Sequence, residues 1–264
     1  MKNKHIIRIN PETCIGCGLC KRDCPAGNIQ IENKKAKILT QSCIMCGHCV
    51  AICPKAAVTM TGFDEPPIEI GKPATLNPQE LLAALRTRRS IRQFTKQQVE
   101  PELIAQIIEA GRLTPTGKNA QDVSYIVLQD GINRFEQPAV RLFRRILPLM
   151  KLVSPVAKRT VIDEHFFFKK APAAIAIVSR GQINGALAAA DMALMAESCG
   201  LGVLYSGFFS MAANHSRSLR RMLGLKRGEK VVMTLVLGYS GVTYHQTAQK
   251  EAASVRHFHF KMSK

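Results

Sequence analysis

One cysteine pattern occurs twice near the start of this 264-residue chain, and it restricts the fold of that part more than any other feature. Each copy has the spacing C-x2-C-x2-C-x3-C-P, and the second begins at Cys43, 29 residues after the first begins at Cys14. The eight cysteines are Cys14, Cys17, Cys20 and Cys24, then Cys43, Cys46, Cys49 and Cys53. Thiols at such short spacing favour two loops that each wrap a compact inorganic group.

Both runs resemble the bacterial two-cluster ferredoxins, whose cysteines hold two [4Fe–4S] clusters. In those proteins the fourth cysteine of each run ligates the other cluster. The resemblance therefore implies two crossed ligand sets. One is Cys14, Cys17, Cys20 and Cys53, and the other is Cys43, Cys46, Cys49 and Cys24.

Two other uses of cysteine fit this pattern less well. Disulfide frameworks belong to small secreted domains, and residues 1–10 contain no apolar segment typical of a signal peptide. Structural zinc takes four ligands from paired knuckles rather than from two runs closed by Cys-Pro. We therefore expect iron–sulfur clusters.

Composition divides the chain into three parts. Residues 1–62 have little aliphatic bulk, so cluster binding would supply much of their folding free energy. Residues 63–79 contain four prolines and predict an extended linker. Residues 80–264 are rich in aliphatic side chains and predict a second domain with a C-terminal tail. No apolar run reaches the roughly 18–20 residues of a membrane span, and we expect a cytoplasmic protein with no membrane partner.

The second domain shows alternating signals for helices and strands. Asn77-Pro78-Gln79-Glu80 predicts a helix start, and apolar residues at helical spacing follow Pro101. β-rich runs occupy residues 123–128, 173–178 and 231–237. The fold class is therefore α+β, a sandwich of helices covering a mixed sheet, preceded by the small cysteine module.

The segment 183–198 predicts a helix that is apolar on nearly every side, because its only charged residues are Asp191 and Glu197. Such a helix must be buried on most sides. In a domain of this size, burial against a second subunit as well as the sheet is expected. We therefore predict a homodimer.

Three polar segments indicate a binding site in the second domain. The first is Arg88-Arg89-Ser90-Ile91-Arg92, in which guanidinium groups and a hydroxyl suit a phosphate. The second is the loop Pro115-Thr116-Gly117-Lys118-Asn119-Ala120-Gln121, and the third is a Gly-Leu-Gly loop over residues 200–208. In this order and spacing they resemble the FMN-dependent nitroreductase family, over about residues 81–241. The whole chain thus resembles a ferredoxin–nitroreductase fusion.

That resemblance implies a role for each of the three segments. Arg88, Arg89, Ser90 and Arg92 would hold the FMN phosphate and ribityl chain. Pro115, Thr116, Asn119 and Gln121 would reach the flavin from the partner subunit, and Tyr205, Ser206 and Gly207 would lie along the flavin ring. The chain departs from the family at Asp122, where proline often stands, and near the C-terminus, where Lys250 is the remaining candidate cation.

Residues 139–170 match no motif. We expect this segment to line the substrate side, with Phe166, Phe167 and Phe168 as an aromatic wall or as core, and with at least one of them in the core.

The formal net charge is +18. Two clusters would remove about four of these charges and a flavin phosphate about two more, so a basic surface remains. Because the chain lacks tryptophan and any nucleic-acid-binding motif, we expect no nucleic-acid partner. A solvated surface, or a docking face for an acidic electron donor, is the better interpretation.

These features predict an iron–sulfur flavoprotein oxidoreductase. Electrons would come from an acidic donor protein or from NAD(P)H, and would pass through two [4Fe–4S] clusters and FMN to a small electron-poor acceptor of the nitroaromatic or quinone type. Two alternatives stay open. One is reduction of an activated double bond or of free flavin, and the other is a non-enzymatic electron carrier or redox sensor. No side chain is assigned as catalytic, because the flavin itself would supply the chemistry.

Overall fold

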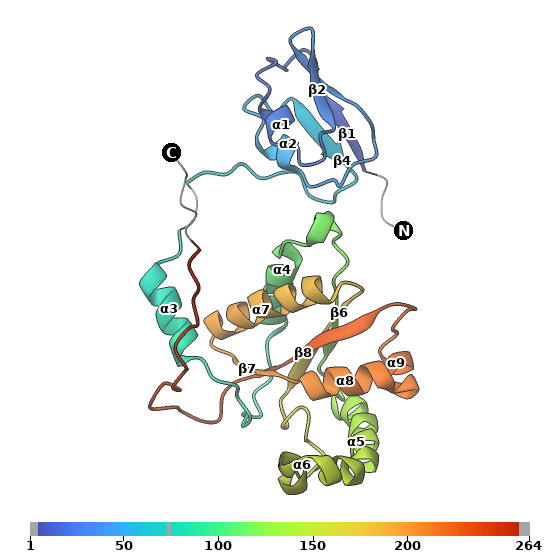
Figure 1. The fold of residues 1–264 in the computed structure, drawn as a ribbon, viewed down its shortest axis with the longest axis vertical. Coiled ribbons are helices and arrows are strands. Elements are labelled where there is room, and N and C mark those ends of the chain that lie inside the picture. The colour runs from blue at the N-terminus through green and yellow to red at the C-terminus, as the bar shows by residue number, and fades with distance from the viewer. Residues whose placement is uncertain (1–4, 73–74, 259–264) are drawn as a thin grey trace.

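The structure of the chain is a computed structural model that describes residues 5–72 and 75–258. Pro73 of the predicted linker lies outside this range. The described chain comprises a small N-terminal module and a larger α+β domain (Figure 1).

The N-terminal module repeats one unit, as its sequence does. The first unit contains β1 (Ile6–Ile9), α1 (Leu19–Arg22) and β2 (Ile29–Glu32). The second contains β3 (Lys35–Ile38), α2 (His48–Ala51) and β4 (Val58–Thr61). β1 pairs with β4 and β2 with β3, both antiparallel, so each small sheet takes one strand from each unit. The two units are therefore interlocked.

The core of this module is small, because it is built around Ile7, Ile29 and Val58 together with the thiols of Cys20 and Cys49. So few aliphatic side chains bury little apolar surface, which agrees with the expectation that bound metal supplies folding free energy.

The larger domain is built on a four-stranded sheet with strand order β5-β6-β8-β7. The strands are β5 (Ser124–Leu128), β6 (Ala173–Ser179), β7 (Gly202–Tyr205) and β8 (Lys230–Gly238), and their pairings are antiparallel. The expected mixed sheet is therefore antiparallel in its strand pairings, and Ser90 adds one isolated parallel bridge to Val203 at the β7 edge.

Helices cover both faces of this sheet (Figure 1). The helices of the larger domain are α3 (Pro78–Thr87), α4 (Pro101–Leu113), the 3-10 helix η1 (Gly117–Asn119), α5 (Asn133–Val153), α6 (Pro155–Arg159), α7 (Gln182–Ser198), α8 (Gly207–His215) and α9 (Arg217–Met222). Of these, α3 lies apart from the sheet and buries no residue. Residues of β6 alternate between two cores. Ile175 and Ile177 pack with α4 and α7, whereas Ala174 and Ala176 pack with α5, α8 and α9. The result is a three-layer sandwich.

Most predicted elements occur near their expected positions. Asn77 caps α3, because its side chain accepts hydrogen bonds from the N–H groups of Gln79 and Glu80. The prediction of a loop over residues 200–208 was wrong in part, because Gly202–Tyr205 forms β7 and Gly207 begins α8. Glycine and small polar residues suggested a loop there, but pairing with β8 outweighs that local preference.

Helix α7 packs closely on one side only. A side chain at Gly185 would meet Val232 at 2.7 Å, and one at Gly111 of α4 would meet Met192 of α7 at 2.7 Å. On the opposite side, Ile183 is 75% exposed and Leu187 is 47% exposed. This uncovered apolar face is the surface that the predicted homodimer would bury.

Within the described residues, no helix is both long enough and apolar enough to cross a membrane.

Candidate functional site

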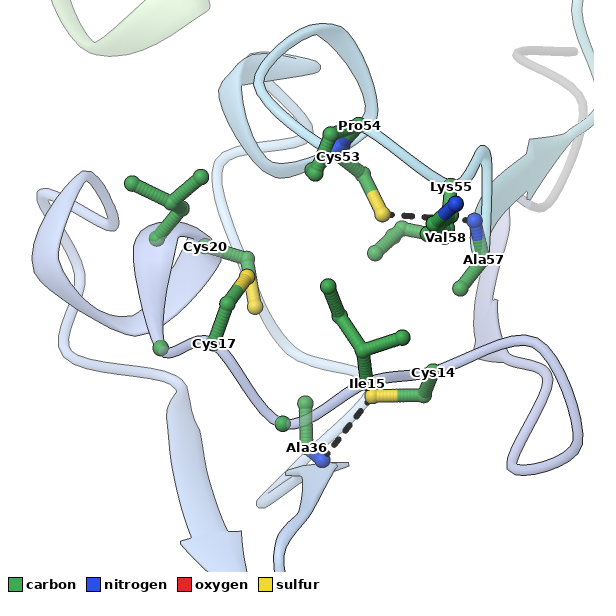
Figure 2. A pocket seen from close by; sticks show the side chains of 13 residues that line it. Cys14, Ile15, Cys17, Cys20, Ala36, Cys53, Pro54, Lys55, Ala57 and Val58 are labelled. Atoms are coloured by element: carbon green, nitrogen blue, oxygen red, sulfur yellow. Dashed lines mark hydrogen bonds between the residues drawn. The ribbon is translucent and has the colours of Figure 1, made fainter.

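The eight cysteines of the repeated motif line two separate cavities in the N-terminal module. Cys14, Cys17, Cys20 and Cys53 line the first cavity, where their side chains surround a common space (Figure 2). Cys24, Cys43, Cys46 and Cys49 line the second. In each set, three cysteines come from one run and the fourth from the other, which is the grouping that the ferredoxin resemblance implies.

Turns in the repeated unit aim the thiols at these cavities. Gly18 and Gly47 precede α1 and α2 with φ values of 74° and 76°, a left-handed conformation that glycine adopts without a steric penalty. Each short helix then carries one buried ligand candidate, Cys20 or Cys49.

Backbone N–H groups also point at the sulfur atoms. In the first cavity, Ala36 donates to Cys14 Sγ at 3.4 Å and Ala57 to Cys53 Sγ at 3.3 Å. In the second, Asn28 donates to Cys24 Sγ at 3.3 Å and Met45 to Cys43 Sγ at 3.4 Å. Such bonds favour the thiolate form and tune the reduction potential of a bound cluster.

The thiols differ in acidity because their surroundings differ. The N–H of Ala36 holds the pKa of Cys14 below its usual value. Burial raises the pKa of Cys20, and it raises the pKa of Cys49 to about 11. Cluster assembly must therefore displace protons from the two buried thiols.

The cavities suit a cluster better than a single ion. Within the described ranges 5–72 and 75–258, no three potential ligands lie close enough together to hold one metal ion. A cubane needs its thiolates farther apart, because each of its iron atoms takes one of them. His48 lies beside the second cavity, but its Nδ1 is 3.1 Å from Asp23 Oδ2, so it is engaged elsewhere.

The arginine-rich segment 88–92 lies along the free edge of β7. Ser90 bridges to Val203, and the N–H of Ile91 donates to the Val203 carbonyl at 2.9 Å. Ile91 is thereby buried, whereas Arg88, Arg89, Ser90 and Arg92 are exposed. Gly202 makes this approach possible, because a side chain there would meet Ile91 at 2.7 Å. The motif thus presents three guanidinium groups on a fixed strip, a donor set that suits a phosphate.

Residues of the C-terminal segment and of α7 lie close to the arginine strip. The Arg89 guanidinium lies 5.5 Å from the ring centroid of Tyr244, which brings the C-terminal segment beside the strip. Lys250 is exposed in that same segment. Burial raises the pKa of Glu197 at the end of α7, and the charge of nearby Arg88 opposes that rise.

Tyr205, Ser206 and Gly207 follow directly from β7. Tyr205 is half-buried, and its hydroxyl donates to the Ala189 carbonyl at 3.3 Å. Gly207 is exposed and faces open space. Ser206 differs from its neighbours, because its hydroxyl points into the core and donates to the Phe167 carbonyl at 3.0 Å.

The backbone of Ser206 is also engaged. Its N–H donates to Thr234 and its carbonyl accepts from Ser210. Ser206 therefore fixes the start of α8.

The loop of residues 115–121 is held at the other end of α7. Asn184 Oδ1 accepts from the N–H of Gly117 at 3.0 Å, and Asn184 Nδ2 donates to Asp122 Oδ1 at 2.7 Å. Asp122 Oδ2 also accepts from Ser179 Oγ and from the N–H of Gly181, each at 3.0 Å. Pro115 and Gln121 are exposed, and Thr116 and Asn119 are half-buried.

Asp122 is a functional candidate that the sequence did not reveal, since it stood only as a departure from the family pattern. Burial acts to raise its pKa, but the hydrogen bonds from Asn184, Ser179 and Gly181 outweigh burial and lower it. An ionised Asp122 thus clamps the loop to the start of α7.

Within one chain, the structure does not bring together all three polar segments, which are residues 88–92, 115–121 and 200–208. The loop is tied to Asn184 near the start of α7, whereas Arg88 acts on Glu197 near its end. At 1.5 Å per residue these points are about 20 Å apart. The arginine strip and residues 205–207 do lie together, because both adjoin β7.

The phenylalanines of the aromatic segment 166–168 differ in how deeply they are buried. Phe167 and Phe168 are buried, and Phe166 is half-buried. Phe166 and Phe143 lie beside exposed Phe208 at the start of α8. Glu136, which sequence reasoning missed, is fully buried and accepts the N–H groups of Phe167 and Phe168 at 2.8 and 2.7 Å.

Comparison with known proteins gives two family matches. Residues 85–239, more than half of the chain, match the nitroreductase family, and residues 6–54 match a 4Fe-4S dicluster domain. The chain is 25% identical over 162 residues to a protein of Archaeoglobus fulgidus that carries the name NADH dehydrogenase/NAD(P)H nitroreductase, a match that covers 61% of this chain and 86% of that protein.

Solved structures share the fold of the larger domain. A nitroreductase with bound FMN from Desulfitobacterium hafniense matches with a TM-score of 0.57 and 21% identity, over 69% of this chain and 100% of that one. A nitroreductase with bound FMN from Bacteroides fragilis matches with a TM-score of 0.51 and 18% identity, over 67% of this chain and 99% of that one. At these identities the likeness establishes the fold.

Proposed function

The chain belongs to the nitroreductase family and carries a 4Fe-4S dicluster domain ahead of the family's domain, and from this premise we propose that it passes electrons from two [4Fe–4S] clusters through FMN to a small electron-poor acceptor. Nitroaromatics and quinones are the acceptor class. The protein is an FMN-dependent oxidoreductase of nitroreductase type, and its cofactors are FMN and the two clusters. When bound, the clusters carry single electrons, and the flavin accepts them singly and donates hydride.

One observation carries this proposal. Two separate four-cysteine cavities occur on the same chain as an exposed strip of arginines beside β7. A single-electron module and a flavin site on one polypeptide favour electron transfer between them over either function alone.

The protein's residues have defined tasks in this reaction. We assign Cys14, Cys17, Cys20 and Cys53 to one cluster and Cys24, Cys43, Cys46 and Cys49 to the other, supported by the lining of the two cavities. Arg88, Arg89 and Arg92 would bind the phosphate of FMN, with Ser90 and Lys250 beside them. Tyr205 and Gly207 would face the flavin ring, and Phe143, Phe166 and Phe208 would exclude water from the acceptor side.

A homodimer is part of the proposal. The apolar side of α7 is uncovered at Ile183 and Leu187, and α3 is uncovered at Leu82 and Leu85. In an isologous pair, two copies of α7 can pack antiparallel, so that the loop at the start of one helix approaches the arginine strip at the end of the other. That arrangement would bring the three polar segments together, whereas in a single chain the loop of residues 115–121 lies far from the other two.

Electrons would enter from an acidic donor protein or from NAD(P)H. The net charge of +18 favours an acidic donor, because complementary charge speeds encounter. We place the enzyme in the cytoplasm, whose reducing conditions preserve free thiols.

Anaerobic titration tests the proposed route. Reduced ferredoxin, NADH and NADPH would be added separately while cluster and flavin absorbance are followed, and turnover would be measured with a nitroaromatic and a quinone. We expect ferredoxin to bleach the cluster absorbance first and the flavin absorbance next. Flavin that stays oxidised beside reduced clusters would contradict the route.

A further inference from the structure

Asn119 joins the two halves of the chain through its side-chain amide. Its Nδ2 donates to the carbonyl of Ile44 at 3.1 Å and to that of Met45 at 2.8 Å. Both carbonyls lie between Cys43 and Cys46, in the loop that lines the second cysteine cavity. A contact of the nitroreductase half therefore falls directly on a cluster-binding loop.

The neighbours of Asn119 fix the orientation of its amide. Carbonyl groups can only accept hydrogen bonds, so the nitrogen must face Ile44 and Met45. On the other side, Asn119 Oδ1 accepts from Gln121 Nε2 at 3.3 Å. The carboxamide is thus a specific clamp with donors on one side and an acceptor on the other.

Both loops at this contact have unusual backbone conformations. Met45 has φ 52° on the module side, and Lys118 and Asn119 have φ 53° and 51° on the other. Asparagine tolerates the left-handed region, whereas methionine and lysine enter it rarely. Such conformations persist where the surroundings hold them, and they concentrate at functional contacts.

The clamp is anchored to the body of the larger domain. Gly117, in the same short helix, donates to Asn184 of α7, and Asp122 holds the end of the loop. The position of Ile44 and Met45 is thus linked, through one loop, to the helix that packs on the sheet. Figure 1 shows the module placed beyond the η1 end of the larger domain.

We propose that Asn119 is a positioning residue that holds the Cys43–Cys46 loop against the nitroreductase half, so that the cluster of Cys24, Cys43, Cys46 and Cys49 would deliver electrons to the flavin that the loop of residues 115–121 reaches in the proposed homodimer. The cluster of Cys14, Cys17, Cys20 and Cys53 is then the entry point. With the cofactors bound, the other cluster would supply the flavin with two electrons, one at a time, and would be reduced again by the entry cluster between them. The two protons would come from water. This assignment rests on the proposed function.

The key variants are Asn119→Asp and Asn119→Ala. Aspartate tolerates the left-handed backbone as asparagine does, but it has no N–H to donate and would place a carboxylate against two carbonyls. Alanine removes the amide without adding charge. Asn133→Asp, at an exposed position at the start of α5, is the control for the change in charge.

Hydrogen exchange measures the contact independently of electron transfer. In the full cofactor-loaded protein, losing two neutral hydrogen bonds should shift the balance between docked and undocked module by about thirtyfold. We expect amides of residues 41–49 and 115–121 to exchange faster in both Asn119 variants and to be unchanged in the control. Unchanged exchange in the Asn119 variants, or faster exchange in Asn119→Asp alone, would overturn the proposal.

Stopped-flow reduction by ferredoxin then tests the electron route. In both Asn119 variants, flavin reduction by way of the clusters should slow at least about tenfold more than flavin reduction by NAD(P)H, with both rates expressed per bound FMN. A variant that loses FMN and keeps normal exchange would identify Asn119 as a flavin ligand and overturn the positioning role. If wild-type clusters do not reduce the flavin, the proposed function fails, and exchange alone then decides whether the clamp exists.

Discussion

Glu136 offers a sharp test of how the aromatic segment is held. It is fully buried in α5, and its Oε1 accepts the N–H groups of Phe167 and Phe168 at 2.8 and 2.7 Å. Glu136→Ala would leave both N–H groups buried without an acceptor. Each such group costs about 1–3 kcal/mol, so the free energy of unfolding should fall by about 2–6 kcal/mol.

Glu136→Gln is the matched control, because its side-chain carbonyl can still accept both bonds in nearly the same shape. It should cost less than about 1.5 kcal/mol. Thermal unfolding of the FMN-loaded protein, followed by circular dichroism, would compare the variants. At about 2–4 °C per kcal/mol for a chain of this size, Glu136→Ala should unfold at least about 4 °C below the wild type.

The dependence on pH gives an independent check. Burial raises the pKa of Glu136, although the hydrogen bonds from Phe168 and Phe167 and the charge of His165 act against that rise. A raised folded pKa means that the stability contribution is present below the unfolded pKa of about 4.3 and is lost as pH rises through the folded value. Glu136→Gln, which does not titrate, should therefore gain stability relative to the wild type as pH rises.

Two results would refute this reasoning. One is a Glu136→Ala protein within about 1 kcal/mol of the wild type, which would mean that the two N–H groups find other partners. The other is a Glu136→Gln protein as unstable as Glu136→Ala, which would mean that charge rather than hydrogen-bond acceptance holds the segment.

Four other perturbations test the cofactor sites and the link between them. Arg92→Ala should weaken FMN about ten- to hundredfold in equilibrium dialysis and leave riboflavin unaffected, because one charge-assisted phosphate contact is lost; equal losses would exclude the phosphate role. Anaerobically purified protein should hold about eight iron ions, and Cys20→Ala and Cys53→Ala should abolish the same EPR signal; loss of different signals would disprove the crossed pairing. The lowered pKa of Asp122 means that its stabilisation is present above its unfolded pKa of about 3.9 and is lost as pH falls through the folded value, so acid unfolding curves of Asp122→Asn should be flatter; identical curves would count against the clamp. A chain that begins at Asn77 should bind FMN and keep NAD(P)H-driven turnover but lose ferredoxin-driven turnover; if ferredoxin drove it equally well, the clusters would lie off the path.

Local sequence features predicted a large part of this protein. The spacing of cysteines within each run is a matter of a few residues, so it defines the loop that wraps a cluster and needs no distant information. The cap at Asn77 and the apolar spacing after Pro101 also act within one or two turns of helix. For the same reason β5, β6 and β8 were predictable as segments. The strand β7 was expected as loop, and the strand order β5-β6-β8-β7 was not predictable.

Tertiary structure decided the features that depend on residues far apart in the chain. The hydroxyl of Ser206 points into the core because it donates a hydrogen bond to the carbonyl of Phe167, 39 residues away. Glu136 acquires its role only because the Phe167–Phe168 turn packs over α5. The contact of Asn119 with the Cys43–Cys46 loop spans about 75 residues and two domains. Such contacts depend on how complete elements pack, and no periodicity or motif within a single segment encodes that packing.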